Sequence, residues 1–137
     1  YRHERMLDEM FEFWGRHTLC NMEGIYTVDL NNSDFLIRLL QDAISASKAT
    51  LVEIVCHKFS PEGASIIAIL KESHVALHIY PEHCALFLDA FTCGKISDPE
   101  KIALMFVECL SPKTFAIETI TRCSPELKKD IFKHNIG

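Results

Sequence analysis

The stretch ASIIAILKESHVALHIY, residues 64–80, decides the fold. Two apolar runs rich in β-branched residues form its two halves, and such runs are typical of β-strands. We therefore predict strands over residues 64–73 and 75–80, which follow each other directly in the chain. The pair Glu72-Ser73 stands where the first strand ends, and His74 and His78 follow it.

Further strands are predicted on both sides of this stretch. TLVEIVCHKF, residues 50–59, is rich in β-branched residues, and the turn residues Ser60-Pro61-Glu62-Gly63 follow it, so residues 50–73 are predicted to form a hairpin. On the other side, Pro81-Glu82 ends a strand, and CALFLDAFTC, residues 84–93, is predicted to form the next one, which Gly94 breaks.

Two helices are predicted outside this group of strands. NNSDFLIRLLQDAISASKA, residues 31–49, has apolar residues at helical spacing, and Asn32 or Ser33 can cap its first turn. In the second helix, residues 98–110, Asp98 can serve as the cap. Pro99 would then occupy the first helical position, where its missing N–H removes no hydrogen bond.

The two ends of the chain complete the pattern. GRHTLCNMEG, residues 15–24, and KTFAIETITR, residues 113–122, are each predicted to form a strand. Residues 2–14 are expected to form a short helix or an appended arm, and the polar tail from Cys123 is expected to end in a short helix.

The resulting order is strand, helix, three or four strands, helix, strand. Such an order predicts an α+β fold, a two-layer sandwich in which a mainly antiparallel sheet has its helices packed on one face. The length of 137 residues predicts a single domain over residues 1–137.

The composition argues against several classes of partner. The formal net charge of −5 does not favour nucleic acid, and no apolar run approaches the ~18 residues that a membrane span needs. With no signal peptide recognised, we expect no nucleic-acid or membrane partner and a cytoplasmic location. The six cysteines include no C-x-x-C pair and are expected to be reduced thiols.

Common catalytic and metal motifs are missing from the sequence, which has no Gly-rich phosphate loop, H-E-x-x-H or G-x-S-x-G. His74 and His78 would share one face of a strand but lie roughly 13 Å apart along it, so we expect no metal site there. A thiol–imidazole pair of Cys93 and His78 is another possibility.

One ordered set of motifs is more specific. GASIIAILKESHVALHIYPE, residues 63–82, together with LDAFTCG, residues 88–94, closely resembles the S-adenosylmethionine decarboxylase proenzyme family in its short prokaryotic form. Gly15-Arg16-His17, the region His57–Gly63 and Asp98-Pro99 are also similar to that family. The resemblance covers roughly residues 15–122.

The resemblance implies that the chain cuts itself between Glu72 and Ser73 into a β chain, residues 1–72, and an α chain, residues 73–137. The Ser73 hydroxyl would attack the Glu72 carbonyl and turn the amide into an ester. Elimination would then convert Ser73 into a pyruvoyl group at the new N-terminus. Ser65 would support the processing through hydrogen bonds, and His78 would be the base for the elimination.

The implied activity is that of a carboxy-lyase, which converts S-adenosylmethionine into S-adenosylmethioninamine for spermidine and other polyamines. The covalently bound pyruvoyl group from Ser73 would be the cofactor and form a Schiff base with the substrate, with no metal. Cys93 would donate a proton after carbon dioxide leaves. Phe59 and Tyr80 would stack on the adenine, and Glu82 would bind the ribose hydroxyls.

Two departures from the family pattern bear on the substrate: Ile79 replaces a more usual Thr, and residues 83–87 are less aromatic. One alternative is therefore a pyruvoyl-dependent arginine or ornithine decarboxylase on the same scaffold. Another is an uncleaved, inactive regulatory partner of an active enzyme. By the same resemblance, two processed αβ units would pair as a homodimer with their sites at or near the interface.

Overall fold

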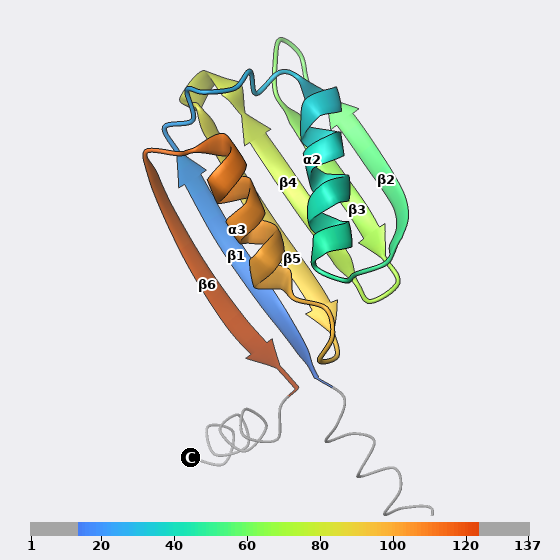
Figure 1. The fold of residues 1–137 in the computed structure, drawn as a ribbon. Coiled ribbons are helices and arrows are strands. Elements are labelled where there is room, and N and C mark those ends of the chain that lie inside the picture. Colours follow the sequence, from blue (N-terminus) through green and yellow to red (C-terminus); the bar gives the residue numbers. More distant parts are fainter. Residues whose placement is uncertain (1–13, 124–137) are drawn as a thin grey trace, which may run out of the picture.

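A computed structural model describes residues 14–123, which form one six-stranded antiparallel sheet and two α-helices (Figure 1). The strands are β1 (Gly15–Glu23), β2 (Leu51–Lys58), β3 (Ala64–Leu70), β4 (His74–Tyr80), β5 (Ala85–Cys93) and β6 (Thr114–Arg122). The helices are α2 (Ser33–Ala46) and α3 (Pro99–Leu110), and a short 3₁₀ helix, η1 (Pro81–His83), joins β4 to β5. The predicted α+β sandwich is confirmed.

The order of the strands across the sheet is β2-β3-β4-β5-β1-β6, and every neighbouring pair is antiparallel. The predicted run of consecutive strands over residues 50–93 is therefore confirmed as the meander β2 to β5. Strand β1 lies between β5 and β6, although it comes first in the chain. This placement puts the start of β1 beside the end of β5, with Gly15 opposite Cys93.

The two helices cover the same face of the sheet, and the core lies between the two layers (Figure 1). Alternate residues of β1 and β4, such as Cys20, Met22 and Leu77, point into this core and are fully buried. Helix α3 contributes Phe106, which is also fully buried. Successive side chains of a strand point to opposite faces, so the residues between these point to the other face of the sheet.

The helices begin where the sequence predicts. The side chain of Asn32 accepts a hydrogen bond from the N–H of Phe35 at 3.1 Å. Asp98 accepts from the N–H groups of Glu100 and Lys101 at 3.1 and 3.4 Å, and Pro99 is the first residue of α3. Each cap satisfies donors that the first turn of a helix leaves without a partner.

One strand boundary differs from the prediction by three residues, and the others agree to within one residue. The strand predicted over residues 64–73 ends at Leu70, because Lys71 and Glu72 form a tight turn into β4. The N–H of Leu70 donates to the carbonyl oxygen of Ser73 at 2.9 Å and closes this turn. The segments predicted over residues 2–14 and from Cys123 onward lie outside the described residues, apart from Trp14 and Cys123 themselves. Among residues 14–123, no helix combines the length and apolar character needed to cross a membrane.

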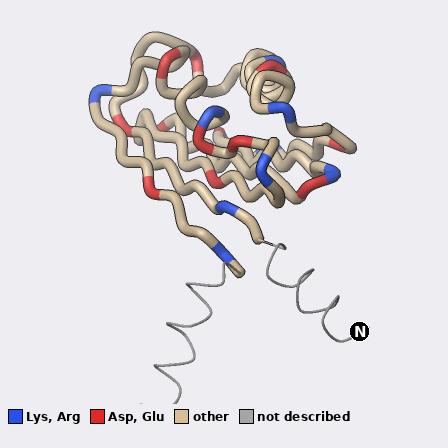
Figure 2. Tube along the Cα trace, turned by 60° about the horizontal axis from the view of Figure 1, so that its bottom comes forward, with Lys and Arg blue, Asp and Glu red and all other residues tan. Residues whose placement is uncertain are grey.

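The sheet face turned away from the helices, here called the open face, is partly apolar. All six strands carry large apolar side chains on it that are at least 38% exposed: Leu19, Val55, Ile67, Ile69, Tyr80, Phe87 and Ile120. Lys, Arg, Asp and Glu lie mostly in the helices and loops, and the strands carry few of them (Figure 2). The open face is therefore suited to contact with another surface.

Candidate active site

The Glu72–Ser73 peptide bond lies at the end of the tight β3–β4 turn. Besides the Leu70–Ser73 hydrogen bond, two contacts with Thr50 hold this turn. The N–H of Thr50 donates to Oε1 of Glu72 at 2.7 Å, and the N–H of Lys71 donates to the carbonyl oxygen of Thr50 at 2.9 Å. Both ends of the turn are thus fixed by hydrogen bonds, so the orientation of the Glu72–Ser73 bond is defined by the fold.

Cys93 lies near this bond because β4 and β5 are antiparallel. Strand β4 begins at His74, which is paired with Phe91, and β5 ends at Cys93. A cleft of about 240 Å³ is lined by Glu72 and Cys93, together with Lys48, Thr50 and residues 94–97. The structure therefore places the predicted cleavage site and the predicted proton donor at one end of the sheet.

The other predicted residues gather at the opposite end of β4. Ser65 and His78 are paired across β3 and β4, and the Ser65 Oγ lies 3.1 Å from the His78 Nδ1. Both line a cleft of about 210 Å³ with the three residues predicted to bind substrate, Phe59, Tyr80 and Glu82. Five of the eight predicted residues thus share one cleft.

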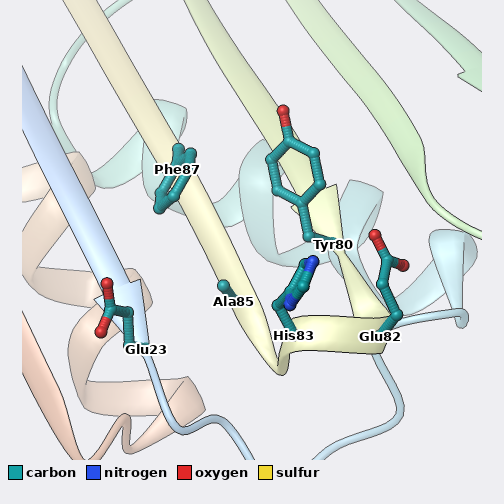
Figure 3. A pocket seen from close by; sticks show the side chains of 6 residues that line it. All are labelled: Glu23, Tyr80, Glu82, His83, Ala85 and Phe87. Atoms are coloured by element: carbon teal, nitrogen blue, oxygen red, sulfur yellow. The ribbon is translucent and has the colours of Figure 1, made fainter.

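A larger cleft, of about 590 Å³, adjoins this one and shares Tyr80 and Glu82 with it. Figure 3 shows Tyr80 and Phe87 rising from neighbouring strands, with Glu82 and His83 on η1 and Glu23 at the end of β1. The rings of Tyr80 and Phe87 have centroids 5.4 Å apart. Aromatic rings beside carboxylates are suited to a flat ligand that carries a positive charge.

Within one chain, the two ends of β4 do not form a single site. His74 is paired with Phe91 and His78 with Phe87, so the two histidines are four residues apart on the same face. That spacing corresponds to roughly 13 Å along the strand. The thiol–imidazole pair of Cys93 and His78 considered from the sequence is therefore wrong for a single chain, because Cys93 lies at the far end of β5.

A cluster that the sequence analysis did not predict lies beside Ser73 on the open face. Nε2 of His17 and Nε2 of His74 lie 3.2 and 3.1 Å from the same atom, Oδ1 of Asp89. Nδ1 of His74 lies 3.4 Å from the Ser73 Oγ. Strands β1, β4 and β5 bring these residues together, and their ligand atoms lie within 4.8 Å of one another, a donor set that can hold a metal ion.

Sequence comparison places the chain among known proteins. A sequence model of the family described as S-adenosylmethionine decarboxylase matches residues 16–123. An S-adenosylmethionine decarboxylase proenzyme of Brevibacillus brevis is 36% identical over 107 residues, which are 77% of this chain and 80% of the relative. A proenzyme of the same name from Methanococcus aeolicus is 36% identical over 110 residues, 80% of this chain and 94% of the relative.

Comparison of structures agrees with the sequence comparison. The crystal structure of the adenosylmethionine decarboxylase from Aquifex aeolicus is similar with a TM-score of 0.74 and 25% sequence identity. The match covers 81% of this chain and 92% of that protein, so it includes most of the sheet and helices described above. The resemblance inferred from residues 63–94 is thus confirmed over nearly all the described residues, and the chain belongs to the S-adenosylmethionine decarboxylase family.

Proposed function

We propose that this chain is a proenzyme that cuts itself between Glu72 and Ser73 and then decarboxylates S-adenosylmethionine for polyamine synthesis. The observation that supports it most is the position of the Glu72–Ser73 bond, in a hydrogen-bonded turn beside Cys93. Family membership and relatives named as proenzymes support the same reading. The products would be a β chain, residues 1–72, and an α chain, residues 73–137.

The first reaction uses only groups of the protein itself. The Ser73 hydroxyl attacks the carbonyl carbon of Glu72, and the amide becomes an ester as the C–N bond breaks. His78 of a second copy of the chain then removes the α-proton of Ser73, and elimination releases the Glu72 carboxylate as the end of the β chain. The dehydroalanine left at position 73 hydrolyses, with loss of ammonia, to the pyruvoyl group. Ser65, in contact with His78, supports this processing.

The residues at position 73 and around it fit a pyruvoyl group, because Cys93 and Glu72 line the same cleft and Ser73 is half-buried. When present, that group supplies an electron sink for the electrons left on the α-carbon as carbon dioxide departs. The thiol of Cys93 is positioned to donate the proton that this carbon needs. Phe59 and Tyr80 bind the adenine, and Glu82 accepts hydrogen bonds from the ribose.

The separation of the two groups of residues implies a homodimer. Ser73 and Cys93 lie at one end of β4, while Ser65, His78 and the substrate-binding residues lie at the other. A second copy packed on the open face, with its strands reversed by a two-fold axis, would place its His78 over Ser73. The exposed apolar residues of the open face would be buried by this contact.

The alternatives are weaker. The relatives described above are named S-adenosylmethionine decarboxylases, which favours this substrate over arginine or ornithine. Intact Ser73, Cys93 and a Ser65–His78 contact argue against an inactive partner. The six cysteines are free, which fits the reducing cytoplasm that we propose as the location.

Intact mass is the test of self-cleavage. Two chains that end at Glu72 and begin with a pyruvoyl group at position 73 are expected from the purified protein. A single full-length chain would refute the proposal. Carbon dioxide release from S-adenosylmethionine, arginine and ornithine then tests the substrate, and faster release from either amino acid would show that the substrate assignment is wrong.

A further inference from the structure

The hydrogen bonds of the cluster His17, His74 and Asp89 fix where the protons on its imidazoles must be. A carboxylate oxygen only accepts hydrogen bonds, so Oδ1 of Asp89 requires a proton on Nε2 of each histidine that contacts it. A neutral imidazole carries one proton. When His74 is neutral, its Nδ1 therefore holds a free lone pair.

This lone pair faces the residue at the proposed cleavage site. The Ser73 Oγ lies 3.4 Å from Nδ1 of His74, so the hydroxyl is the donor of that contact. Ser73, His74 and Asp89 thus have the order of contacts of a serine–histidine–aspartate triad, with the two imidazole nitrogens exchanged. The side chain of Asp89 is 27% exposed and that of His74 is 39% exposed, so both are accessible to solvent.

We propose that His74 is the general base that takes the hydroxyl proton of Ser73 in the first step of self-cleavage, and that Asp89 is its positioning residue. The inference rests on the self-cleavage proposed above, and it assigns a second imidazole to that reaction. His78 is responsible for the α-proton of Ser73, which is removed later. The two protons leave from different atoms in different steps.

The step balances without any further reactant. As the Ser73 Oγ bonds to the carbonyl carbon of Glu72, its proton moves to Nδ1 of His74, and the carbonyl π electrons move to the oxygen. When this tetrahedral intermediate collapses, the C–N bond breaks and Nδ1 returns the proton to the departing nitrogen of Ser73. The products are an ester, a free amine and neutral His74. Asp89 stabilises the imidazolium between these two transfers.

His17 donates to the same oxygen of Asp89 from the other side. Its ring meets that of His74 edge to face, with centroids 5.9 Å apart, and also contacts Phe91. His17 therefore holds the carboxylate in the direction of His74. A metal ion on the same cluster would require both Nε2 atoms without protons, and neutral His74 would then carry its proton on Nδ1. Metal binding and the base role are thus mutually exclusive.

The main test detects the ester, which is the product of the first step. Hydroxylamine cuts esters but not amides under mild conditions. We expect His74→Gln to slow formation of the two chains by roughly 10²-fold or more, with little cutting by hydroxylamine, because the ester does not form. His78→Ala, in contrast, should accumulate the ester and be cut at position 72. His57→Gln is the matched control: this exposed histidine of β2 lies outside the cluster, and cleavage should proceed at the original rate.

The role of Asp89 is tested by the position of the proton on His74. In the uncut Ser73→Ala protein, ¹⁵N NMR of neutral His74 should show the proton on Nε2. Asp89→Asn should move this proton to Nδ1, since an amide N–H can donate to Nε2. In the protein that keeps Ser73, Asp89→Asn should slow cleavage as His74→Gln does. A proton on Nδ1 when Asp89 is intact would overturn the proposal. Asp42→Asn, an exposed carboxylate on α2, is the control.

A chelator distinguishes a role of His74 as a base from a role as a metal ligand. Cleavage should continue in EDTA and be slowed by added Zn²⁺, and cleavage that depends on added Zn²⁺ would overturn the proposal. The outcomes also separate this inference from the proposed function. If the original protein never forms two chains, self-cleavage itself fails. If it does so and His74→Gln keeps the same rate, only the role of His74 is wrong.

Discussion

At the residue scale, the role proposed for Cys93 is confined to turnover. We expect Cys93→Ala to cut itself normally but to release carbon dioxide from S-adenosylmethionine about 10²-fold more slowly, because the variant lacks the proposed donor of the proton that is needed after decarboxylation. A denaturing gel measures the first property and a carbon dioxide assay the second. Cys56→Ala, at an exposed position of β2, is the control. Unchanged turnover in Cys93→Ala would remove this thiol from the mechanism.

Cys20 gives a prediction on stability. Burial raises the pKa of its thiol from 9.0 to about 11. Between these values the unfolded thiol loses its proton while the native thiol keeps it, so the free energy of unfolding should fall as the pH rises. The slope is at most about 1.4 kcal/mol per pH unit. Denaturant unfolding of uncut Ser73→Ala protein, with and without Cys20→Ala, measures this slope at fixed protein concentration.

The difference between the two slopes isolates Cys20 from the lysines and tyrosines that titrate in the same range. Cys20→Ala also removes buried atoms and lowers stability at every pH, so only the slope is compared. Equal slopes in the two proteins would show that the buried thiol does not contribute to the alkaline loss of stability.

The residue scale also shows the limit of what the sequence predicts. Ser65, Ser73, His78 and Cys93 could be proposed as site residues because they belong to motifs that resemble a known family and occur in order along the chain. His17 and Asp89 were missed because 72 positions separate them, and only the pairing of β1 with β5 brings them together. Sequence spacing predicts neighbours within a helix or hairpin, but it does not specify which distant strands pair.

At the element scale, the cap of α3 connects stability to the Cys93 cleft. Residues 94–97 line that cleft and lead directly into Asp98. Asp98→Ala removes the acceptor for two N–H groups and should lower the free energy of unfolding by about 1 kcal/mol. Denaturant unfolding in the uncut Ser73→Ala protein measures the loss. Asp42→Ala, which removes an exposed carboxylate within α2, should cost less, and an equal cost would show that the cap has no special effect.

Elements were predicted well because their signals are local. Alternating apolar residues predict the strands, and the caps Asn32 and Asp98 mark the helix starts, since each signal acts within a few residues. The end of β3 was placed three residues late, because Lys71 and Glu72 lack the Gly or Asn that usually marks such a turn. The insertion of β1 between β5 and β6 follows from pairing across the whole chain, and so no local signal predicted it.

At the scale of the whole molecule, one sheet face is covered and the other is not. Helices α2 and α3 cover the core on one side (Figure 1). Seven large apolar side chains remain exposed on the open face. Sheets pack face to face at about 10 Å, so a second copy would cover these residues. In the homodimer proposed above, a two-fold axis across the strands would reverse β4, and the Ser73 end of each copy would then meet the His78 end of the other.

This arrangement predicts that two inactive chains restore each other. Ser73→Ala lacks the residue to be cut, and His78→Ala lacks the base for elimination, so neither should form two chains alone. In a mixed dimer, one site has Ser73 from the His78→Ala chain and His78 from the Ser73→Ala chain, and that site is complete. Random pairing of equal amounts puts half of the His78→Ala chains in mixed dimers, so about half of them should be cut.

Co-expression of the two variants, with different tags for purification, measures this by intact mass. The pyruvoyl group should appear only on fragments of the His78→Ala chain, because only that chain keeps Ser73. Co-expression of Ser73→Ala with Ser73→Ala/His78→Ala is the control and should give no cut chain. If each site were built within one chain, every chain in the mixed dimer would still lack one of the two groups. Absence of cutting in mixed dimers that are isolated by both tags would therefore show that the site is not shared.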